Sequence, residues 1–286
     1  MINSLCIIGV GLIGGSLARA LRATGYCKEV VGGGRDPQHL QQAVDLGVID
    51  RFDTDLAAAV AGADMVLVAV PLGAMQTVFE KIRDHLEDNA VLTDAGSAKG
   101  SVIEAAQRVF GSVPAWFVPG HPIAGTENSG VSASLPDLYH DRRVILTPME
   151  NTDVSAVSRV RRMWEAAGAK VTEMDSIHHD AVLAATSHLP HVLAFTLVNS
   201  LGRTGDREEL FAYAAGGFRD FTRIASSDPV MWRDICLANG DAILLRIDQF
   251  IEDLQALRRS VQEEDGERLL DLFESAKQVR DAFIEK

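Results

Sequence analysis

A histidine in a glycine-rich segment is the residue of this chain best suited to acid–base chemistry. The segment reads Gly120-His121-Pro122-Ile123-Ala124-Gly125-Thr126-Glu127, and we expect it to form a loop beyond the end of a strand. A histidine titrates near neutral pH, so it can take a proton while a neighbouring cofactor takes a hydride. Taken alone, such a histidine is more often a structural or surface residue, so its role depends on what surrounds it.

A glycine loop near the N-terminus is the first element that could bring a cofactor to this histidine. The run Gly9-Val10-Gly11-Leu12-Ile13-Gly14 ends the apolar stretch that starts at Leu5. In this G-x-G-x-x-G pattern the glycines allow a tight turn, a close approach of pyrophosphate and close packing of helix on strand, and the phosphates lie on the N–H groups of the helix. A glycine-rich turn that binds another ligand is the alternative. The expected cofactor contacts are Gly9, Gly11, Leu12, Ile13 and Gly14.

The second strand carries the residues that distinguish NADP from NAD. An NAD site places Asp or Glu at the end of this strand, about 20 residues after the glycine loop, to accept from the ribose hydroxyls. The sequence Val30-Val31-Gly32-Gly33-Gly34-Arg35-Asp36-Pro37 has glycine there and then Arg35, whose charge suits a 2′-phosphate. The expected cofactor is NAD(P), with NADP favoured over NAD. Asp36 is either a ribose ligand shifted by one residue or the cap of the helix that Pro37 begins.

A later strand supplies a further cofactor contact. Open α/β sheets bind ligands at the carboxyl ends of strands where the strand order reverses. The run Val68-Ala69-Val70-Pro71-Leu72 ends a strand at such a point. We therefore expect Val70 and Pro71 to lie against the cofactor, although an ordinary strand-ending proline is an equal alternative.

The pattern of apolar segments divides the chain into two parts. Up to about Thr172, short apolar runs alternate with helix-length stretches, which predicts βαβ units and a mostly parallel sheet covered on both faces. After about Asp175, apolar residues recur three and four apart, as in amphipathic helices. We expect domains at 1–173 and 174–286. The expected strands are Leu5–Val10, Glu29–Val31, Asp64–Val70, Ala90–Thr93, Trp116–Val118, Val144–Leu146 and Ala169–Val171.

The composition is that of a soluble globular protein. The chain has 286 residues, of which 47% are hydrophobic and 23% charged. Without a signal pattern or an apolar run approaching the roughly 18 residues of a membrane span, a cytoplasmic protein with no membrane partner is expected. The net charge of -13 argues against a nucleic-acid partner. Cys6, Cys27 and Cys236 have no disulfide or zinc spacing, so no metal is expected.

Four further segments lie before and after the histidine loop. Their occurrence together and in this order is a more specific family signal than any single segment. Thr93-Asp94-Ala95-Gly96-Ser97-Ala98-Lys99 precedes it, and three segments follow: Ser187-His188-Leu189-Pro190-His191, Gly216-Gly217-Phe218-Arg219-Asp220-Phe221-Thr222-Arg223-Ile224-Ala225 and Ser227-Asp228-Pro229-Val230-Met231-Trp232-Arg233-Asp234. Together they resemble the prephenate/arogenate (cyclohexadienyl) dehydrogenase family. The resemblance implies an α/β N-terminal Rossmann-type dinucleotide-binding domain, an all-α C-terminal domain for dimerisation and substrate binding, and a homodimer.

The resemblance also implies an oxidative decarboxylation in tyrosine biosynthesis. In this family a ring hydroxyl of prephenate or arogenate is oxidised, hydride passes to NAD(P)+, and a ring carboxylate leaves as CO2. His121 matches the catalytic histidine that accepts a hydrogen bond from the hydroxyl. Ser97 matches the serine that fixes the substrate hydroxyl and the histidine beside the cofactor. The other role open to Ser97 is that of a helix N-cap.

A set of substrate contacts follows from the same resemblance. Arg223 matches an arginine that binds a carboxylate, which a guanidinium can grip with two hydrogen bonds. Arg219 would lie on the same helical face as Arg223 if the segment is helical. His191 is expected at the pocket and His188 in a structural role. The remaining expected contacts, each with a plain alternative as a loop, capping or core residue, are Thr126, Glu127, Asp180 and Trp232.

Two other functions fit the N-terminal fold, because a fold alone does not specify chemistry. A β-hydroxyacid-type dehydrogenase would carry a catalytic lysine on a helix of the second half, but residues 171–276 contain no lysine. A choice between prephenate and arogenate would need the acidic residue that faces the substrate side chain, and Asp180, Glu127 and Asp220 are all candidates. A non-catalytic dinucleotide sensor would need the glycine loop but not the catalytic set around His121.

Overall fold

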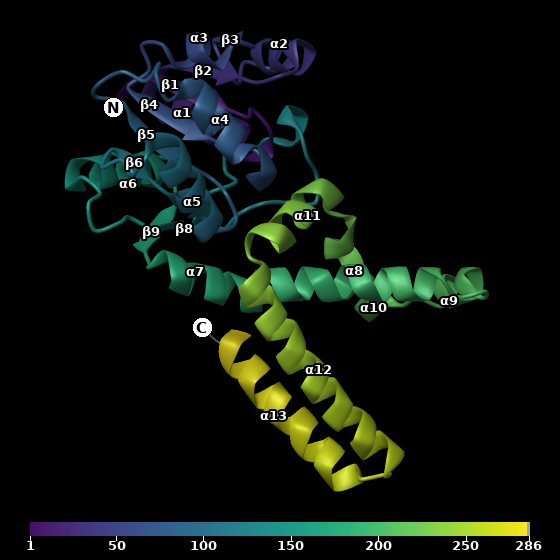
Figure 1. Ribbon diagram of the computed structural model, residues 1–286. Helices are drawn as coiled ribbons and strands as arrows, with labels where there is room; N and C mark the ends of the chain where they lie inside the picture. Colours follow the sequence, from purple (N-terminus) through teal and green to yellow (C-terminus); the bar gives the residue numbers. More distant parts are fainter. Residues whose placement is uncertain (285–286) are drawn as a thin grey trace. The chain divides into compact units, whose positions relative to one another are not determined.

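Six parallel strands form the central sheet of the computed structural model, which describes residues 1–284 (Figure 1). The strand order is β3-β2-β1-β4-β5-β6, which confirms the expected parallel sheet. The order reverses between the adjacent strands β1 and β4, where open sheets of this kind bind ligands. The strands are β1 (Ile2–Ile8), β2 (Cys27–Gly33), β3 (Arg51–Asp53), β4 (Met65–Val68), β5 (Val91–Asp94) and β6 (Phe117–Val118).

Alternate residues of the central strands enter two separate hydrophobic cores, one on each face of the sheet. Leu5 and Ile7 of β1 belong to the first core, whereas Cys6 and Ile8 belong to the second. A strand buried on both faces must be apolar at every position. This is why these strands read as continuous apolar runs in the sequence.

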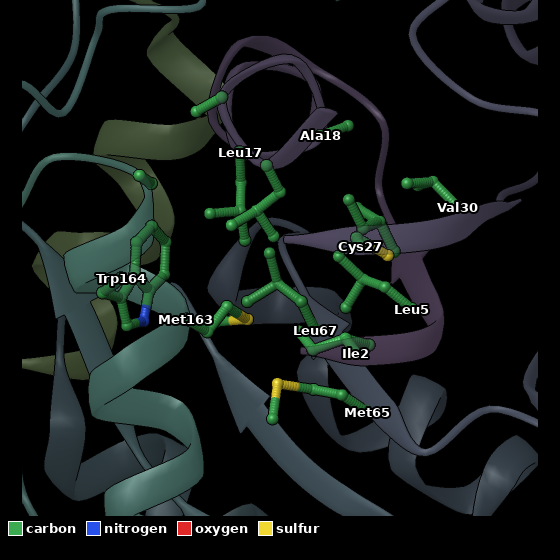
Figure 2. Packing of buried hydrophobic residues seen from close by; sticks show 14 of the residues in the cluster. Ile2, Leu5, Leu17, Ala18, Cys27, Val30, Met65, Leu67, Met163 and Trp164 are labelled. Atoms are coloured by element: carbon green, nitrogen blue, oxygen red, sulfur yellow. The ribbon is translucent and has the colours of Figure 1, made fainter. Parts of the chain in front are cut away.

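Helices cover both faces of this sheet. Helices α1, α2 and α6 contribute to the first core, and α3, α4 and α5 to the second. Trp164 of α6 and Leu17 of α1 are completely buried in the first core (Figure 2). The helices are α1 (Leu12–Ala23), α2 (Pro37–Asp45), α3 (Leu56–Val60), α4 (Met75–Ile82), α5 (Lys99–Phe110) and α6 (Val154–Ala166), with 3₁₀ turns η1 (Leu72–Ala74) and η2 (Val131–Ala133).

A second, three-stranded sheet carries the histidine segment. Strand β7 (Gly120–Pro122) pairs antiparallel with β8 (Arg143–Leu146), which pairs parallel with β9 (Lys170–Glu173). His121 lies within β7, opposite Ile145, so the expectation of a loop at this position is wrong. The sequence did not indicate β3 or β7 because each has three residues, and β7 contains Gly and Pro, which disfavour strands.

The described chain after β9 forms no further strand, which confirms the change to an all-helical part. The chain packs as two compact units, Met1–Gly240 and a second that begins at Asp241, so helices α7 to α11 belong to the same unit as the parallel sheet. The elements are α7 (Ser176–Leu183), the π-helical turn η3 (Ala184–His188), α8 (Leu189–Gly202), α9 (Arg207–Ala212), α10 (Gly216–Thr222), the 3₁₀ turn η4 (Arg223–Ser226), α11 (Pro229–Ala238), α12 (Gly240–Gln262) and α13 (Gly266–Ile284).

One helical run has the length and hydropathy of a membrane span. The run Ser176–Gly202, formed by α7, η3 and α8, has 27 residues and a mean hydropathy of 1.5 in its most apolar window. The expectation that no stretch approaches a span is therefore wrong. His, Ser and Thr interrupt the run in the sequence, while the alanines, valines and leucines between them keep its mean hydropathy high. Its first turns belong to the site described below.

Candidate functional site

The glycine loop has the geometry that a pyrophosphate needs. Gly9 has φ = 96°, and a Cβ there would lie 2.3 Å from the carbonyl oxygen of Ala69, so only glycine fits. A Cβ on Gly14 would lie 2.6 Å from Ile7, so α1 packs directly on β1. Nothing lies within 4 Å of a Cβ built on Gly11, the N-cap of α1, which makes no side-chain capping bond. An anion can therefore reach the first N–H groups of α1, and the loop fits NAD(P).

Arg35 is free at the position expected to meet the adenosine end of the cofactor. β2 ends at Gly33, and Arg35 is exposed, without a hydrogen bond or ion pair to any residue in the described range. Oδ1 of Asp36 accepts from the N–H groups of Gln38 and His39 at 2.9 and 3.2 Å. Asp36 thus caps α2, which is the second of the two roles open to it.

One cleft of about 1000 Å³ extends from the glycine loop to the histidine and on to helices of the all-α part. All its lining residues belong to the compact unit Met1–Gly240. The expected site residues that line the cleft are Gly11, Leu12, Ile13, Val70, Pro71, Ser97, His121, Thr126, Glu127, His191, Arg223 and Trp232. The expected site residues outside its lining are Gly9, Gly14, Arg35, Asp180 and Arg219.

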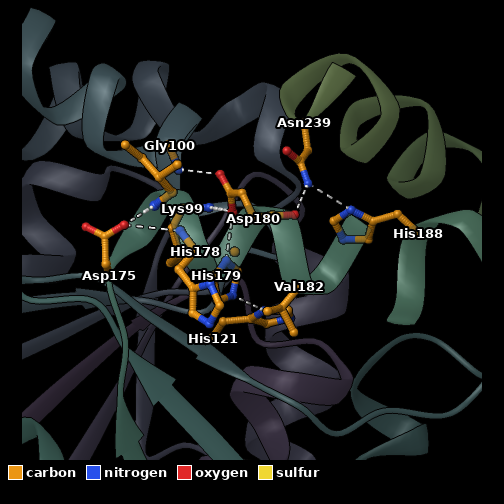
Figure 3. A network of polar contacts seen from close by, with 12 residues as sticks. Lys99, Gly100, His121, Asp175, His178, His179, Asp180, Val182, His188 and Asn239 are labelled. Atoms are coloured by element: carbon orange, nitrogen blue, oxygen red, sulfur yellow. Dashed lines mark hydrogen bonds and ion pairs between the residues drawn. The ribbon is translucent and has the colours of Figure 1, made fainter. Parts of the chain in front are cut away.

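His121 is held by a chain of hydrogen bonds that ends at the first turn of α5 (Figure 3). Its Nδ1 lies 2.9 Å from Nε2 of His179, whose Nδ1 lies 2.7 Å from Oδ1 of Asp180. The carboxylate of Asp180 also accepts from the backbone N–H groups of Lys99 and Gly100, each at 2.8 Å. Asp180 therefore joins α7 to α5 and supports the histidines from outside the cleft.

The direction of these hydrogen bonds determines which nitrogen of His121 can act as a base. A carboxylate only accepts hydrogen bonds, so Nδ1 of a neutral His179 carries the proton and its Nε2 accepts. Nδ1 of His121 must then donate, which leaves the lone pair on Nε2. This Nε2 has no hydrogen-bond partner within residues 1–284, and His121 lines the cleft. The arrangement suits a general base.

Burial keeps His121 in its neutral form. The residue is 8% exposed, and desolvation lowers its pKa well below 6.5, with further lowering by His179, Lys99 and His188. Burial raises the pKa of Asp180, but hydrogen bonds from His179 and from the N–H groups of Lys99 and Gly100 outweigh it, and the pKa is lowered overall. At neutral pH a charged carboxylate therefore supports an uncharged imidazole.

The hydroxyl of Ser97 is available to a ligand. Helix α5 begins at Lys99 with Ala98 as its N-cap and no side-chain capping bond, so the capping alternative for Ser97 is wrong. Ser97 is half-buried and lines the cleft, and its hydroxyl has no hydrogen bond to the part of the chain that the structure describes.

An exposed ion pair lies in the wall of the cleft. Nη1 of Arg223 is 3.0 Å from Oε2 of Glu127, and the two side chains are 61% and 40% exposed. Exposed pairs contribute little in water, so the carboxylate of a ligand can compete with Glu127 for the guanidinium. In the same segment as Glu127, Oγ1 of Thr126 accepts from the N–H of Asn128.

Arg219 is not brought to the cleft with Arg223. Helix α10 ends at Thr222, and Arg223 begins the 3₁₀ turn η4, so the two arginines do not share one regular α-helix. Arg219 is exposed and lies outside the cleft lining. Its substrate role stays a prediction.

Two histidines and a tryptophan form an aromatic part of the cleft wall. The ring of His191 stacks on Trp232, with centroids 3.8 Å apart. Nδ1 of His188 accepts from Nδ2 of Asn239 at 3.1 Å, so Nε2 of His188 carries the proton. This N–H and Nε1 of Trp232 are buried without a partner in the described chain. Burial lowers the pKa of His188 from 6.5 to about 4, so its ring is neutral at pH 7.

Three residues of this site were not expected from the sequence, namely Asp94, Lys99 and His179. Asp94 and Lys99 form a completely buried ion pair, and they lie in the segment Thr93–Lys99 that carried the resemblance. An acid and a base five residues apart at the end of an apolar strand were the available signal. For His179, the signal was an adjacent carboxylate, that of Asp180.

Comparisons with known proteins cover both parts of the chain. A family model described as "Prephenate dehydrogenase, nucleotide-binding domain" matches residues 17–173, and one described as "Prephenate dehydrogenase, dimerization domain" matches residues 175–275. Among curated proteins, a cyclohexadienyl dehydrogenase of Zymomonas mobilis is 40% identical over 283 residues, which cover 96% of this chain and 94% of that protein. A prephenate dehydrogenase of Bacillus subtilis is 38% identical, with 98% and 76% covered.

A solved structure matches this chain over almost its whole length. The prephenate dehydrogenase of A. aeolicus, in complex with hydroxyphenyl propionate and NAD+, superposes with a TM-score of 0.91 at 38% identity, and the match covers 98% of each chain. The glycine loop precedes the residues that the first family model matches, so its assignment depends on its geometry and on this structural match. On these grounds, the chain belongs to the prephenate dehydrogenase family.

Proposed function

We propose that this protein catalyses the oxidative decarboxylation of prephenate, of arogenate or of both, with transfer of hydride to NAD(P)+. The products are CO2 and 4-hydroxyphenylpyruvate or tyrosine. The observation that carries the proposal is Nε2 of His121, which keeps its lone pair and belongs to a residue that lines the same cleft as the glycine loop. Membership of the family supports the substrate class.

His121 acts as the base toward the ring hydroxyl of the substrate. NAD(P)+, when bound, supplies the acceptor for the hydride that leaves the hydroxyl-bearing carbon. As the C–H electron pair departs, the hydroxyl becomes a carbonyl and its proton moves to Nε2 of His121. The bond between ring and carboxylate then breaks, CO2 leaves, and its electron pair makes the ring aromatic. The oxygen takes the proton back from His121 and becomes the phenol, so no net proton is released.

Substrate anchoring falls to residues on other elements of the cleft. A dianionic substrate meets a chain of net charge -13, so local positive charge is required. Arg223 binds one carboxylate in exchange for Glu127, and Ser97 binds the ring hydroxyl. The stacked pair His191 and Trp232 contacts the substrate side chain, and Thr126 belongs to the same set.

NADP is the proposed cofactor in preference to NAD. The support is Arg35, an exposed and unpaired cation two residues after the end of β2, together with the capping of α2 by Asp36. In this short segment Oδ1 of the one carboxylate, that of Asp36, accepts from two N–H groups of α2, whereas a 2′-phosphate finds an unpaired guanidinium.

A homodimer is the proposed assembly, with the cofactor domain at 1–173 and the helical domain at 174–286. The support is the description of the second family model and a set of exposed apolar side chains, since large exposed apolar patches mark interaction sites. On α12 and α13 these side chains are Leu244, Leu245, Ile251, Leu254, Val261, Leu270, Leu272, Phe273 and Val279. Sedimentation equilibrium tests the dimer, and a monomer at micromolar concentration would contradict it.

Steady-state kinetics over two substrates and two cofactors test the reaction. Purified protein with prephenate or arogenate and NADP+ or NAD+ should give growth of absorbance by reduced nicotinamide, together with release of CO2. Absence of reduction in all four combinations would contradict the proposal. Reduction of NADP+ or NAD+ in the presence of a β-hydroxyacid, and not of prephenate or arogenate, would favour the β-hydroxyacid-type dehydrogenase.

A further inference from the structure

A completely buried ion pair joins the two backbone segments that carry Ser97 and His121. Asp94 ends β5 and Lys99 begins α5, and both side chains are 0% exposed. Nζ of Lys99 lies 2.5 Å from Oδ2 of Asp94 and 2.6 Å from the carbonyl oxygen of Gly120.

The carboxylate of Asp94 holds the same two segments by their N–H groups. Oδ1 accepts from the N–H of Gly120 at 3.0 Å, and Oδ2 accepts from the N–H of Gly96 at 2.7 Å. Gly96 precedes Ser97, and Gly120 precedes His121. The ion pair therefore binds the N–H of the residue directly before Ser97, and both the N–H and the C=O of the residue directly before His121.

Glycine at both positions allows this close approach. A Cβ on Gly96 would lie 2.9 Å from Oδ2 of Asp94, and a Cβ on Gly120 would lie 3.1 Å from the main-chain oxygen of Asp94. Contacts this short would push the backbone at Gly96 and Gly120 away from Asp94. The two glycines and the ion pair thus form one packed unit.

Stability alone does not account for such a pair. Two buried charges lose hydration that their mutual attraction only partly restores, and apolar residues of similar volume are often as stable. Apolar side chains would, however, leave the N–H of Gly96 and the N–H and C=O of Gly120 without these partners, and unpaired buried backbone groups are costly. What the ion pair adds is a defined geometry for these peptide groups.

We propose that Asp94 and Lys99 are positioning residues, which hold the hydroxyl of Ser97 and Nε2 of His121 in register. This inference rests on the proposed function. Neither Asp94 nor Lys99 lines the cleft, so they act through the backbone and not by contact with the substrate. A shift of about 1 Å in a reacting group lowers the rate by about 10²-fold.

Three variants test this proposal. Lys99→Met removes the cation at similar length. The double variant Asp94→Asn/Lys99→Met removes both charges, so no unpaired carboxylate is left in the core. Lys170→Met is the matched control, since Lys170 is 68% exposed and pairs with Asp141 at the surface. For each variant the thermal midpoint, the dissociation constant for NADP+, kcat, KM and the pH profile of kcat/KM are measured.

We expect both core variants to bind NADP+ as the wild type does and to lose about 10²-fold in kcat. KM should change little, because Arg223 lies on a separate element. Lys170→Met should match the wild type in every measurement.

The pH profile separates positioning from a loss of folded protein. The charge of Lys99 lowers the pKa of His121, so Lys99→Met should move the acid limb of kcat/KM to higher pH. The other titratable groups near His121 are the same in both core variants, namely His179, Asp180 and His188. The double variant, which removes opposite charges together, should show a smaller shift.

Two kinetic outcomes would overturn the proposal. A folded double variant with wild-type kcat would show that the geometry does not need the pair. Loss of NADP+ binding in proportion to kcat would show that the pair maintains the whole fold. An inactive wild type would instead contradict the proposed function. In that case, crystal structures of the wild type and the double variant would test the positioning role. Displaced peptides at Gly96 and Gly120 in the double variant would support it, and unmoved peptides would contradict it.

Discussion

Nδ1 of His121 and Nε2 of His179 lie 2.9 Å apart although 58 positions separate the two residues in the sequence. The carboxylate of Asp180 lies on the other side of His179, at 2.7 Å from its Nδ1. Because a carboxylate only accepts, each ring donates toward Asp180 through its Nδ1. The lone pair that results at Nε2 of His121 is the chemical basis of the first two predictions.

Replacement of His121 by Asn should lower kcat by about 10²–10⁴-fold, because the substrate hydroxyl loses its base. The dissociation constant for NADP+ should stay unchanged, since the glycine loop is a separate element. Steady-state kinetics and a fluorescence titration with the cofactor measure the two effects. Unchanged turnover would remove His121 from the role of base.

Replacement of His179 by Phe should lower kcat by about tenfold to a hundredfold, since Nδ1 of His121 loses a buried partner. His179 also contributes to the low pKa of His121. Its removal should raise that pKa, so more of the base is protonated at a given pH and the acid limb of kcat/KM moves to higher pH. His178→Phe, at an exposed neighbouring position, is the control. An acid limb that stays in place would contradict the contact.

Replacement of Arg223 by Ala should raise KM for the substrate by about 10- to 100-fold, the worth of a hydrogen bond to a charged group. Glu127→Gln should have the opposite effect and lower KM by about two- to fivefold, because Glu127 no longer competes for Arg223. An exposed ion pair contributes about 0.2–1 kcal/mol. Initial-rate kinetics at saturating cofactor measure both. A rise of KM in Glu127→Gln would show that Glu127 assists binding instead of competing with the substrate.

Replacement of Arg35 by Ala should weaken NADP+ binding by about 10- to 100-fold and leave NAD+ binding unchanged, because only the 2′-phosphate loses a partner. Arg162→Ala, exposed on α6, is the matched control. Equilibrium titration with each cofactor gives the ratio of the two affinities. An unchanged ratio would contradict the assignment of NADP.

Acid should destabilise the fold through His188. Its pKa is lowered from 6.5 to about 4, so the unfolded chain binds a proton in this window that the folded chain does not. Above pH 6.5 His188 therefore does not change the free energy of unfolding. As the pH drops from 6.5 toward 4, the free energy of unfolding falls by roughly 3 kcal/mol in total. Urea unfolding at pH 7.5 and 5 measures the loss, which should be smaller in His188→Gln. Equal losses in the two proteins would rule out this source.

The sequence determined much of the cofactor-binding part, because its signals are local. Apolar runs such as those of β1 and β4 can be buried on both faces only as central strands, and the spacing of Gly9, Gly11 and Gly14 specifies a turn that joins strand to helix. Strands β3 and β7 escaped this reasoning. A three-residue strand shows no periodicity, and it forms because a neighbouring strand offers it hydrogen bonds.

The sequence by itself determined which side chains are available for chemistry and in which segments they stand. Only the tertiary structure decided which atom of His121 is free, because that depends on His179 and Asp180 of α7, which packs against α5. It also decided that Asp94 and Lys99 meet in the core and bind Gly120. The contact of His121 with His179 spans 58 positions of the chain and that of Lys99 with Gly120 spans 21, so no local pattern of residues encodes either contact.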